Sequence, residues 1–151
     1  MEIERKFLVK QLPNLHNFES KTIEQHYINF KPEIRVRKID NDFMLTIKSS
    51  GNLKRKEIEF EITEKQYDEL KSMAGLDSII KTRYYIPYKS FTCELDVYHN
   101  IDNLITVEVQ FEIEEDSKKF LVPEWFGDEI TYLKEFKNQN LARYGIPYIK
   151  N

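Results

Sequence analysis

Hydrophobic and polar residues alternate along most of this chain with the period of two that is typical of β-strands. In the first such stretch, residues 2–9, one face carries the charged side chains Glu2, Glu4 and Lys6. The same alternation recurs in residues 22–30, 33–39, 42–49, 54–62, 79–88, 91–98 and 104–113. The pattern therefore predicts eight β-strands.

The connections between these stretches are short and contain residues that favour turns. They read KPE, DND, SGN and YKS, with Pro, Gly, Asn, Asp or Ser in each. Closely spaced strands of this kind are typical of antiparallel meanders, and eight strands are enough to close a barrel.

Three segments break the alternation. Residues 63–75 predict a helix, because Thr63 can cap it, Gln66 occupies the capping-box position and Gly75 can end it. Residues 114–122 can hold a short helical turn, and residues 131–147 predict a C-terminal helix. We find no repeat or linker, and we expect a single domain over residues 1–151.

Each predicted strand has one apolar face and one charged face, and like charges recur two residues apart. Arg35 and Arg37 form such a pair, as do Glu57 and Glu59, about 7 Å apart along a strand. The ordinary interpretation is a half-buried sheet with its polar face in water. Like charges repel, however, and more strongly away from bulk water. A polyanion along the basic residues, with divalent cations among the carboxylates, would relieve that repulsion, and a metal-bound polyphosphate supplies both.

This pattern predicts an unusual barrel. If the charged face points inward, the apolar face is left outside for helices to pack on. We therefore expect a mainly β (α+β) protein: an eight-stranded antiparallel β-barrel tunnel with a charged interior, helices outside and the C-terminal helix near one mouth. Such a tunnel inverts the packed interior of ordinary small barrels.

Composition narrows the possible chemistry. With 23 Lys and Arg against 26 Asp and Glu, the net charge of −3 argues against a nucleic-acid-binding surface. The four glycines form no phosphate-binding loop, so Arg and Lys side chains would have to bind phosphate. The three histidines and Cys93 lack zinc-like spacing, and a single cysteine excludes an intrachain disulfide.

The location of the protein is also an expectation from the sequence. No apolar run approaches the ~18 residues of a membrane span, and the N-terminus lacks the apolar core of a signal peptide. We expect a cytoplasmic protein without membrane association. The oligomeric state stays open, with a homodimer as one alternative.

The charged stretches resemble, in order, the motifs of the CYTH or triphosphate tunnel metalloenzyme superfamily. EIERKF resembles its ExExK signature, EIRVRK its paired-arginine strand, FMLTIKS its TxK strand and RKEIEFEI its RxExE strand. KTRYY resembles its KxR strand, CELDVY its ExD strand, TVEVQF its ExE strand, and WFGDEIT with FKNQNLA its C-terminal segment. The resemblance covers essentially the whole chain and is greatest to the small bacterial tripolyphosphatases.

The resemblance implies a β-barrel tunnel that hydrolyses or cyclises triphosphates with Mg²⁺ or Mn²⁺. The implied metal ligands are Glu2, Glu4, Asp96, Glu108 and Gln110. The implied phosphate-binding residues are Lys6, Arg35, Arg37, Lys48, Arg55, Lys81 and Arg83. The candidate catalytic residues are Glu59, Asp96 and Lys81, while Glu57 and Glu94 could complete a second metal site.

One residue departs from the family pattern. Gln110 stands where the ExE motif has its second Glu, and an amide can offer an oxygen to a metal but no charge. Glu112, on the same face, is an alternative ligand. Tyr27, Lys134 and Lys137 could lie near the tunnel or be structural, whereas we expect Trp125, Phe126 and Phe136 to be packing residues.

Several functions are compatible with this pattern. The first is metal-dependent hydrolysis of a triphosphate, most simply inorganic tripolyphosphate. Alternatives within the family are a nucleoside or thiamine triphosphatase or an adenylyl cyclase. There are also two non-catalytic alternatives. One is a module that binds polyphosphate or a nucleotide without turnover, and the other is a barrel whose polar face merely contacts water.

Overall fold

The computed structural model describes residues 2–51, 53–75, 77–145 and 147, and most of its regular structure is β-sheet. The strands are β1 Glu2–Val9, β2 Glu19–Phe30, β3 Glu33–Ile39, β4 Asp42–Lys48, β5 Lys54–Arg55, β6 Glu57–Glu61, β7 Ser78–Tyr88, β8 Phe91–Tyr98, β9 Ile105–Phe111 and β10 Phe126–Glu129. The helices are α1 Glu64–Lys71, α2 Glu114–Lys119 and α3 Asn138–Tyr144, with a 3₁₀ turn η1 at Lys134–Phe136.

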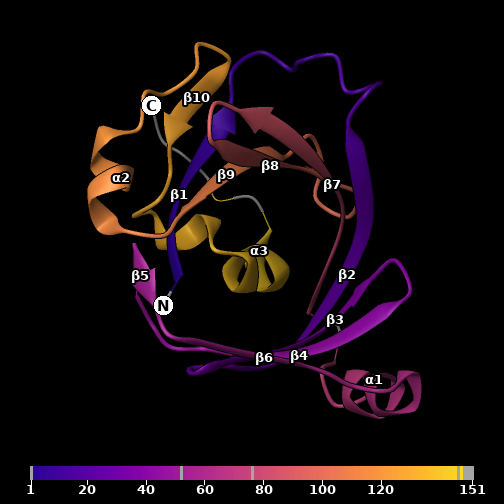
Figure 1. Cartoon of the computed structure of the whole chain (residues 1–151). Helices are drawn as coiled ribbons and strands as arrows, with labels where there is room; N and C mark the ends of the chain where they lie inside the picture. Colours follow the sequence, from indigo (N-terminus) through magenta and orange to yellow (C-terminus); the bar gives the residue numbers. More distant parts are fainter. Residues whose placement is uncertain (1, 52, 76, 146, 148–151) are drawn as a thin grey trace.

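The strands form one antiparallel sheet in the order β10-β1-β9-β8-β7-β2-β3-β4-β6. The sheet curls into a ring, and β5 helps to close it by pairing with β1, with Arg55 opposite Glu2 (Figure 1). Because β6 pairs with β4, the short stretch of chain that forms β5 and β6 bridges β1 and β4. The predicted antiparallel barrel is confirmed.

The stretch 54–62 was predicted as one strand and is two. Ser49 interrupts it, because the backbone N–H of Ser49 donates to the carbonyl of Lys56 and the Ser49 hydroxyl accepts from the Lys56 N–H. These bonds hold the chain at Lys56 between β5 and β6. Together with β10, which the sequence pattern did not predict, this division gives ten strands instead of eight.

Apolar side chains on the outer face of the sheet form one of two cores. Ile3, Phe7, Leu95, Val107 and Val109 pack there with aromatic residues from the C-terminal half. The rings of Phe126 and Trp125 lie 4.6 Å apart between centroids, and that of Phe7 lies 4.9 Å from Phe126. The prediction that Trp125 and Phe126 are packing residues is consistent with this core.

Helix α1 lies outside the barrel against β2, β3 and β4. The predicted capping box is present: the Thr63 hydroxyl accepts from the Gln66 N–H, and the Gln66 side chain accepts from the Thr63 N–H. Tyr67 is buried with its ring centroid 5.1 Å from that of Phe43. The helix ends at Lys71, and Gly75 follows with a φ of 65°.

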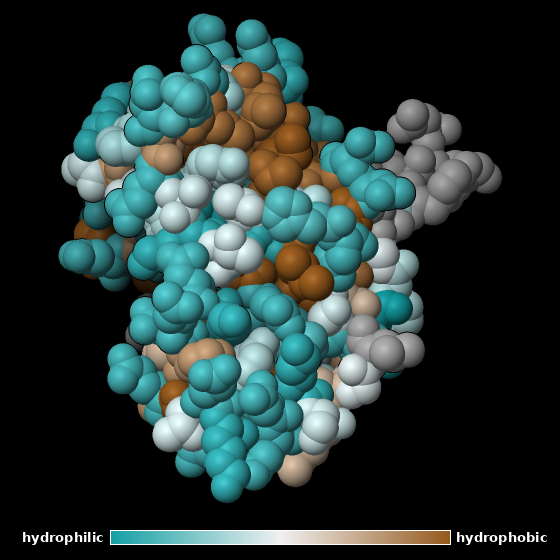
Figure 2. All heavy atoms as spheres, turned by 90° about the vertical axis from the view of Figure 1, so that its right-hand side faces the viewer, coloured by the Kyte–Doolittle hydropathy of each residue, from teal (hydrophilic) through white to brown (hydrophobic). Residues whose placement is uncertain are grey.

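The outer surface is only partly covered by helices. On β6 the outward side chains Ile58 and Phe60 are 62% and 47% exposed. Figure 2 shows the face on the side of β2, where hydrophilic side chains cover most of the surface and apolar ones gather in its upper part. Among the described residues, no helix is long and apolar enough to cross a membrane.

The C-terminal segment closes one end of the barrel. The predicted helix 131–147 is instead η1 and α3, separated by Lys137 in an extended conformation. Side chains take the carbonyls that a continuous helix would use, since Lys6 donates to Phe136 O and Asn140 to Lys134 O. Inside this end of the barrel lies the second core, with Tyr27, Ile79, Tyr98, Phe136 and Leu141. Helix α3 is seen within the outline of the ring in Figure 1.

Candidate functional site

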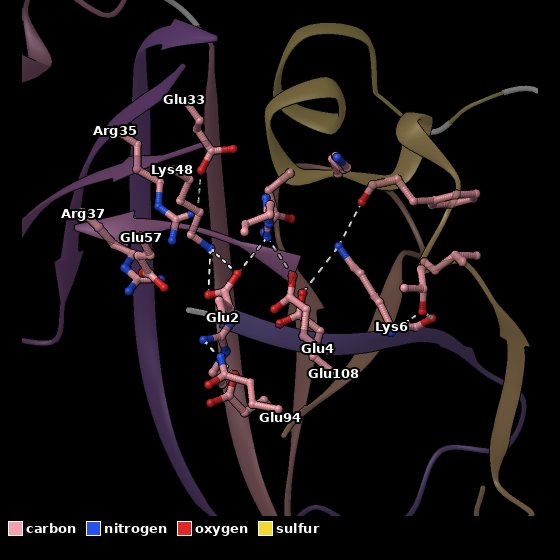
Figure 3. Close-up of a pocket in the computed structure, with 18 of the residues that line it drawn as sticks. Glu2, Glu4, Lys6, Glu33, Arg35, Arg37, Lys48, Glu57, Glu94 and Glu108 are labelled. Carbon is pink, nitrogen blue, oxygen red and sulfur yellow. Dashed lines mark hydrogen bonds and ion pairs between the residues drawn. The ribbon is translucent and has the colours of Figure 1, made fainter. Parts of the chain in front are cut away.

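A cavity of about 350 Å³ lies inside the barrel (Figure 3). Its walls come from the inward faces of the strands, and the C-terminal segment contributes Ile130, Thr131, Leu133, Phe136, Lys137 and Asn138. Most of the predicted site residues line it: Glu2, Glu4, Lys6, Arg35, Arg37, Lys48, Arg55, Glu59, Arg83, Glu108 and Gln110. Strand alternation and antiparallel register therefore bring these dispersed residues together.

Seven carboxylates and seven basic side chains line the cavity among the residues that the structure describes. The acids are Glu2, Glu4, Glu33, Glu57, Glu59, Glu94 and Glu108, and the bases are Lys6, Arg35, Arg37, Lys48, Arg55, Arg83 and Lys137. The neighbouring strands β1, β9 and β8 all carry carboxylates, but ion pairs join strands of opposite charge, such as Lys48 of β4 with Glu2 of β1 and Arg83 of β7 with Asp96 of β8. The repulsion inferred from single strands is thus relieved by ion pairs between strands, which the pattern along one strand could not reveal.

The two carboxylates of β1 share one guanidinium. Arg55 Nη2 donates to Glu2 Oε1 at 3.0 Å and to Glu4 Oε1 at 2.7 Å. Lys48 Nζ also donates to both oxygens of Glu2, at 3.2 Å each (Figure 3). These side chains are almost entirely buried, at 6–12% exposure. Glu2 and Glu4 are therefore bound to cationic side chains and not to solvent.

Glu4 nevertheless lies close to two other carboxylates, those of Glu2 and Glu108. Burial and the neighbouring carboxylates Glu108 and Glu2 raise the pKa of Glu4 to about 7, against the attraction of Lys48 and Arg55. Burial likewise raises the pKa of Glu2. Glu108 behaves differently: burial opposes its charge, but Lys6 and Arg83 outweigh burial and lower its pKa. Among these three carboxylates, the nearby bases outweigh the cost of burial for Glu108 but not for Glu2 and Glu4.

Next to the cavity lies a buried cluster of Arg83, which lines the cavity, and Lys81 and Asp96, which do not. Arg83 binds Asp96 through Nε at 2.8 Å and Nη2 at 3.0 Å, and Lys81 Nζ lies 2.7 Å from the same carboxylate. Lys81 is fully buried, and this burial lowers its pKa to about 7 despite Asp96. For Asp96, Arg83 and Lys81 outweigh burial and lower the pKa. Asp96 and Lys81, both predicted as site residues, are thus paired with each other and do not line the cavity.

The paired arginines of β3 bind two carboxylates. Arg37 Nη2 donates to Glu59 Oε2 at 3.0 Å, and the Thr46 hydroxyl donates to the same oxygen at 2.7 Å. Arg35 Nη1 donates to Glu33 Oε2 at 3.0 Å. Glu33 was missing from the predicted site, although it lies two residues before Arg35 and strand alternation places both on one face.

The remaining predicted residues lie in several environments. Tyr27 is buried at the closed end of the barrel, where its hydroxyl accepts from Gln25 at 2.8 Å. Lys137 lines the cavity and donates to the carbonyl of Gly51, whereas Lys134 does not line it. Glu112 is exposed and outside the cavity lining, while Gln110 lines the cavity opposite Glu4. The cavity also includes Tyr85, Thr131 and Asn138, which no charge pattern could single out.

The donor set fits a divalent cation of the Mg²⁺ or Mn²⁺ type. Among the described residues, no three Asp, Glu, His or Cys side chains are already arranged to hold a metal ion. Glu2 and Glu4 instead converge on Arg55, so a cation already occupies the point where their oxygens meet. Carboxylate oxygens are the ligands that Mg²⁺ and Mn²⁺ prefer. Glu2, Glu4 and the nearby Glu108 thus carry the type of oxygen that such an ion prefers, and in this structure Arg55 stands between Glu2 and Glu4.

Known proteins are similar to this chain in sequence and in fold along nearly its whole length. The CYTH domain family matches residues 1–144. An inorganic triphosphatase of Nitrosomonas europaea is 35% identical over 147 residues, covering 93% of this chain and 96% of that protein. An inorganic triphosphatase of Acetivibrio thermocellus is 30% identical over 146 residues, covering 94% and 93%. The crystal structure of the inorganic triphosphatase NE1496 matches with a TM-score of 0.72 and 32% identity over 97% of both chains. The chain belongs to the CYTH domain family.

Proposed function

We propose that this protein hydrolyses inorganic triphosphate in a reaction that requires Mg²⁺ or Mn²⁺. The observation that carries the proposal is the barrel cavity, which is lined by seven basic and seven acidic side chains and to whose wall the C-terminal segment contributes. Two relatives that are 35% and 30% identical carry the name inorganic triphosphatase, which supports the same substrate here.

The basic side chains would bind the phosphate oxygens. Arginine offers paired planar donors and lysine a compact charge, and both suit phosphate. The proposed phosphate ligands are Lys6, Arg35, Arg37, Lys48, Arg55 and Arg83. Lys81 would act through the buried cluster with Arg83 and Asp96, which holds Arg83 in position.

The acidic side chains of β1 and β9 would hold the metal ion. Glu2, Glu4 and Glu108 are the proposed ligands, with Gln110 as a neutral oxygen donor opposite Glu4. Asp96 is the least suited of the predicted ligands, because Arg83 and Lys81 already bind it. A divalent cation bound there would neutralise charge on the phosphate oxygens and help to align the substrate.

Hydrolysis adds one water across a P–O–P bond. The water oxygen bonds to the terminal phosphorus, the bridging oxygen leaves with pyrophosphate, and a proton from the water must be accepted. Glu59 lines the cavity and can orient the water through its carboxylate. Lys81 is the proposed proton acceptor, since a pKa of about 7 leaves a substantial neutral fraction near neutral pH. Its amine is fully buried against Asp96, so this ion pair must open before the water can reach it.

The test is phosphate release from tripolyphosphate. Purified protein with Mg²⁺ or Mn²⁺ should release phosphate, and the same sample with a chelator should not. ATP and thiamine triphosphate in the same assay distinguish the other activities of the family. Absence of release from all three substrates with either metal would contradict a triphosphatase.

A second candidate is a module that binds polyphosphate without hydrolysis, and Gln110 favours it. The amide lowers the negative charge available to a metal at that position. Thermal stabilisation by tripolyphosphate without phosphate release would support this alternative.

A further inference from the structure

Arg55 occupies the point at which the two acidic side chains of β1 converge. A single nitrogen of its guanidinium contacts Glu2 at 3.0 Å and Glu4 at 2.7 Å. The Arg55 side chain is 12% exposed and those of Glu2 and Glu4 are 8% and 11% exposed. Water therefore contributes little to the solvation of these three charges.

Two proposed ligands of this site compete with that arrangement. A divalent cation at Glu2 and Glu4 needs the oxygens that Arg55 now holds. A phosphate group needs the guanidinium that the two carboxylates now hold. Breaking a buried ion pair by removing only one partner is costly, because the other charge is left without compensation.

The cavity offers Arg55 another position. A side pocket of about 40 Å³ is also lined by Arg55, together with Glu33, Lys48, Ser49 and Lys137. Glu33, which accepts from Arg35 through Oε2, is the carboxylate on that side, and it attracts Arg55 electrostatically in the present arrangement, after Glu4 and Glu2. The guanidinium can move away from β1 without leaving the lined volume.

We infer that Arg55 is an internal counter-ion that occupies the cation position between Glu2 and Glu4 and must leave before a divalent metal binds. The inference rests on the proposed function, because it concerns the same site. It follows that the metal ion and triphosphate bind together. The metal replaces Arg55 at the carboxylates, and the triphosphate replaces the carboxylates at Arg55. Either ligand alone leaves one half of the buried ion pair uncompensated.

The experiment measures Mn²⁺ binding without any phosphate, by isothermal calorimetry and by the electron paramagnetic resonance of free Mn²⁺. It compares the wild-type protein with Arg55→Gln. Arg37→Gln is the matched control, because Arg37 is also a buried cavity guanidinium but pairs with Glu59. Both variants remove one positive charge from the lining, and only Arg55→Gln removes the cation that bridges Glu2 and Glu4, with Lys48 still bound to Glu2.

Arg55→Gln should bind Mn²⁺ alone at least about tenfold more tightly than the wild type, and clearly more tightly than Arg37→Gln. Arg55→Lys, which returns a cation of different shape to the position, should have a Mn²⁺ affinity between those of the wild type and Arg55→Gln. It also serves as the second variant if Arg55→Gln does not fold, in which case Arg55→Lys should differ measurably from the wild type in Mn²⁺ affinity while Arg37→Lys does not.

Equal tightening in Arg55→Gln and Arg37→Gln would overturn the inference, because only the overall charge would then matter. Tight Mn²⁺ binding by the wild type, unchanged in Arg55→Gln, would overturn it as well. The measurement involves no turnover, so it is independent of the proposed activity. Phosphate release by the wild type with unchanged Mn²⁺ affinity in Arg55→Gln would reject the counter-ion and keep the triphosphatase. Tighter Mn²⁺ binding by Arg55→Gln, without phosphate release by the wild type, would support the counter-ion and reject the triphosphatase.

Discussion

At the scale of single residues, two carboxylates of the site have opposite environments. Burial and neighbouring carboxylates raise the pKa of Glu4 to about 7, whereas Arg83 and Lys81 outweigh burial and lower the pKa of Asp96. A metal cation at Glu4 would replace Arg55 as its partner, whereas Asp96 is held by both Arg83 and Lys81. This difference in environment distinguishes Glu4, the proposed metal ligand, from Asp96, which holds other side chains in position.

Glu4→Gln should abolish activity and leave the fold intact. A raised folded-state pKa means that Glu4 favours the folded protein at low pH, and this contribution is lost as the pH rises through about 7. The variant should therefore gain stability relative to the wild type as the pH rises from 5 to 8. Urea unfolding at both pH values measures this, and wild-type turnover at limiting Mg²⁺ would show that Glu4 is not a ligand.

Gln110→Glu should increase the affinity for the metal, because a carboxylate adds charge and a second oxygen beside Glu4. We expect the metal concentration at half-maximal rate to fall by about tenfold, or ~1.4 kcal/mol. Turnover at saturating metal need not rise. An unchanged metal titration would mean that residue 110 does not face the metal. Glu112→Gln is the control, since Glu112 lies outside the cavity lining and should leave the titration unaltered.

Lys81 predicts a particular pH dependence. If its amine accepts the proton, the rate at saturating metal should rise as the pH passes about 7, where Lys81 loses its own proton. Lys81→Arg should remove that rise, because arginine stays protonated. The pKa of Glu4 is also about 7, but the ionisation of Glu4 changes the affinity for the metal. Its effect on the rate should therefore disappear at saturating metal. A rise that persists in Lys81→Arg at saturating metal would exclude Lys81 as the proton acceptor.

At the scale of secondary-structure elements, β10 and the segment after it close the cavity. Outside the barrel, Arg5 donates two hydrogen bonds to Glu129, at 2.9 and 2.6 Å, and one to Ser117 O at 2.9 Å. Inside, Lys6 donates to Phe136 O at 2.9 Å. Adjacent residues of β1 thus hold both ends of one closing segment.

Glu129→Ala should loosen this closing segment. Loss of both bonds from Arg5 should increase amide hydrogen exchange in η1 and α3 more than in β2, and it should raise the KM for triphosphate more than it lowers kcat. Glu114→Gln is the matched control, because its ion pair with Lys54 lies outside the cavity. Unchanged exchange in η1 and α3 would show that the outer ion pair does not hold the segment.

At the scale of the whole molecule, the cavity is neutralised by its own ion pairs. Stabilisation by ligands should therefore be cooperative. The melting temperature with Mn²⁺ and tripolyphosphate together should rise by more than the sum of the two separate shifts. A calorimetric melting scan with each ligand and with both measures this, after correction for Mn²⁺–tripolyphosphate association in solution. Additive shifts would contradict the coupling.

Much of the fold and site could be predicted from the sequence because strand alternation has a strict period. It assigned the charged face of each strand, and the family resemblance then pointed to the basic residues of β1, β3, β4, β5 and β7 as candidates for phosphate binding. It failed where tertiary contacts override local pattern. Hydrogen bonds with Ser49 divided the strand 54–62, and side chains such as Lys6 took the carbonyls that a helix over residues 131–147 needed.

The sequence alone determined which residues face the interior and that the interior is charged, because side-chain direction follows from local backbone geometry. Only the tertiary structure decided how those charges pair. Whether Glu4 meets Arg55, and whether Asp96 meets Lys81, depends on which strands become neighbours and in what register. The pairing of β5 with β1 brings Arg55 into contact with Glu4, from which it is separated by 51 positions in the sequence. Long-range pairing of this kind leaves no trace in the pattern of a single strand.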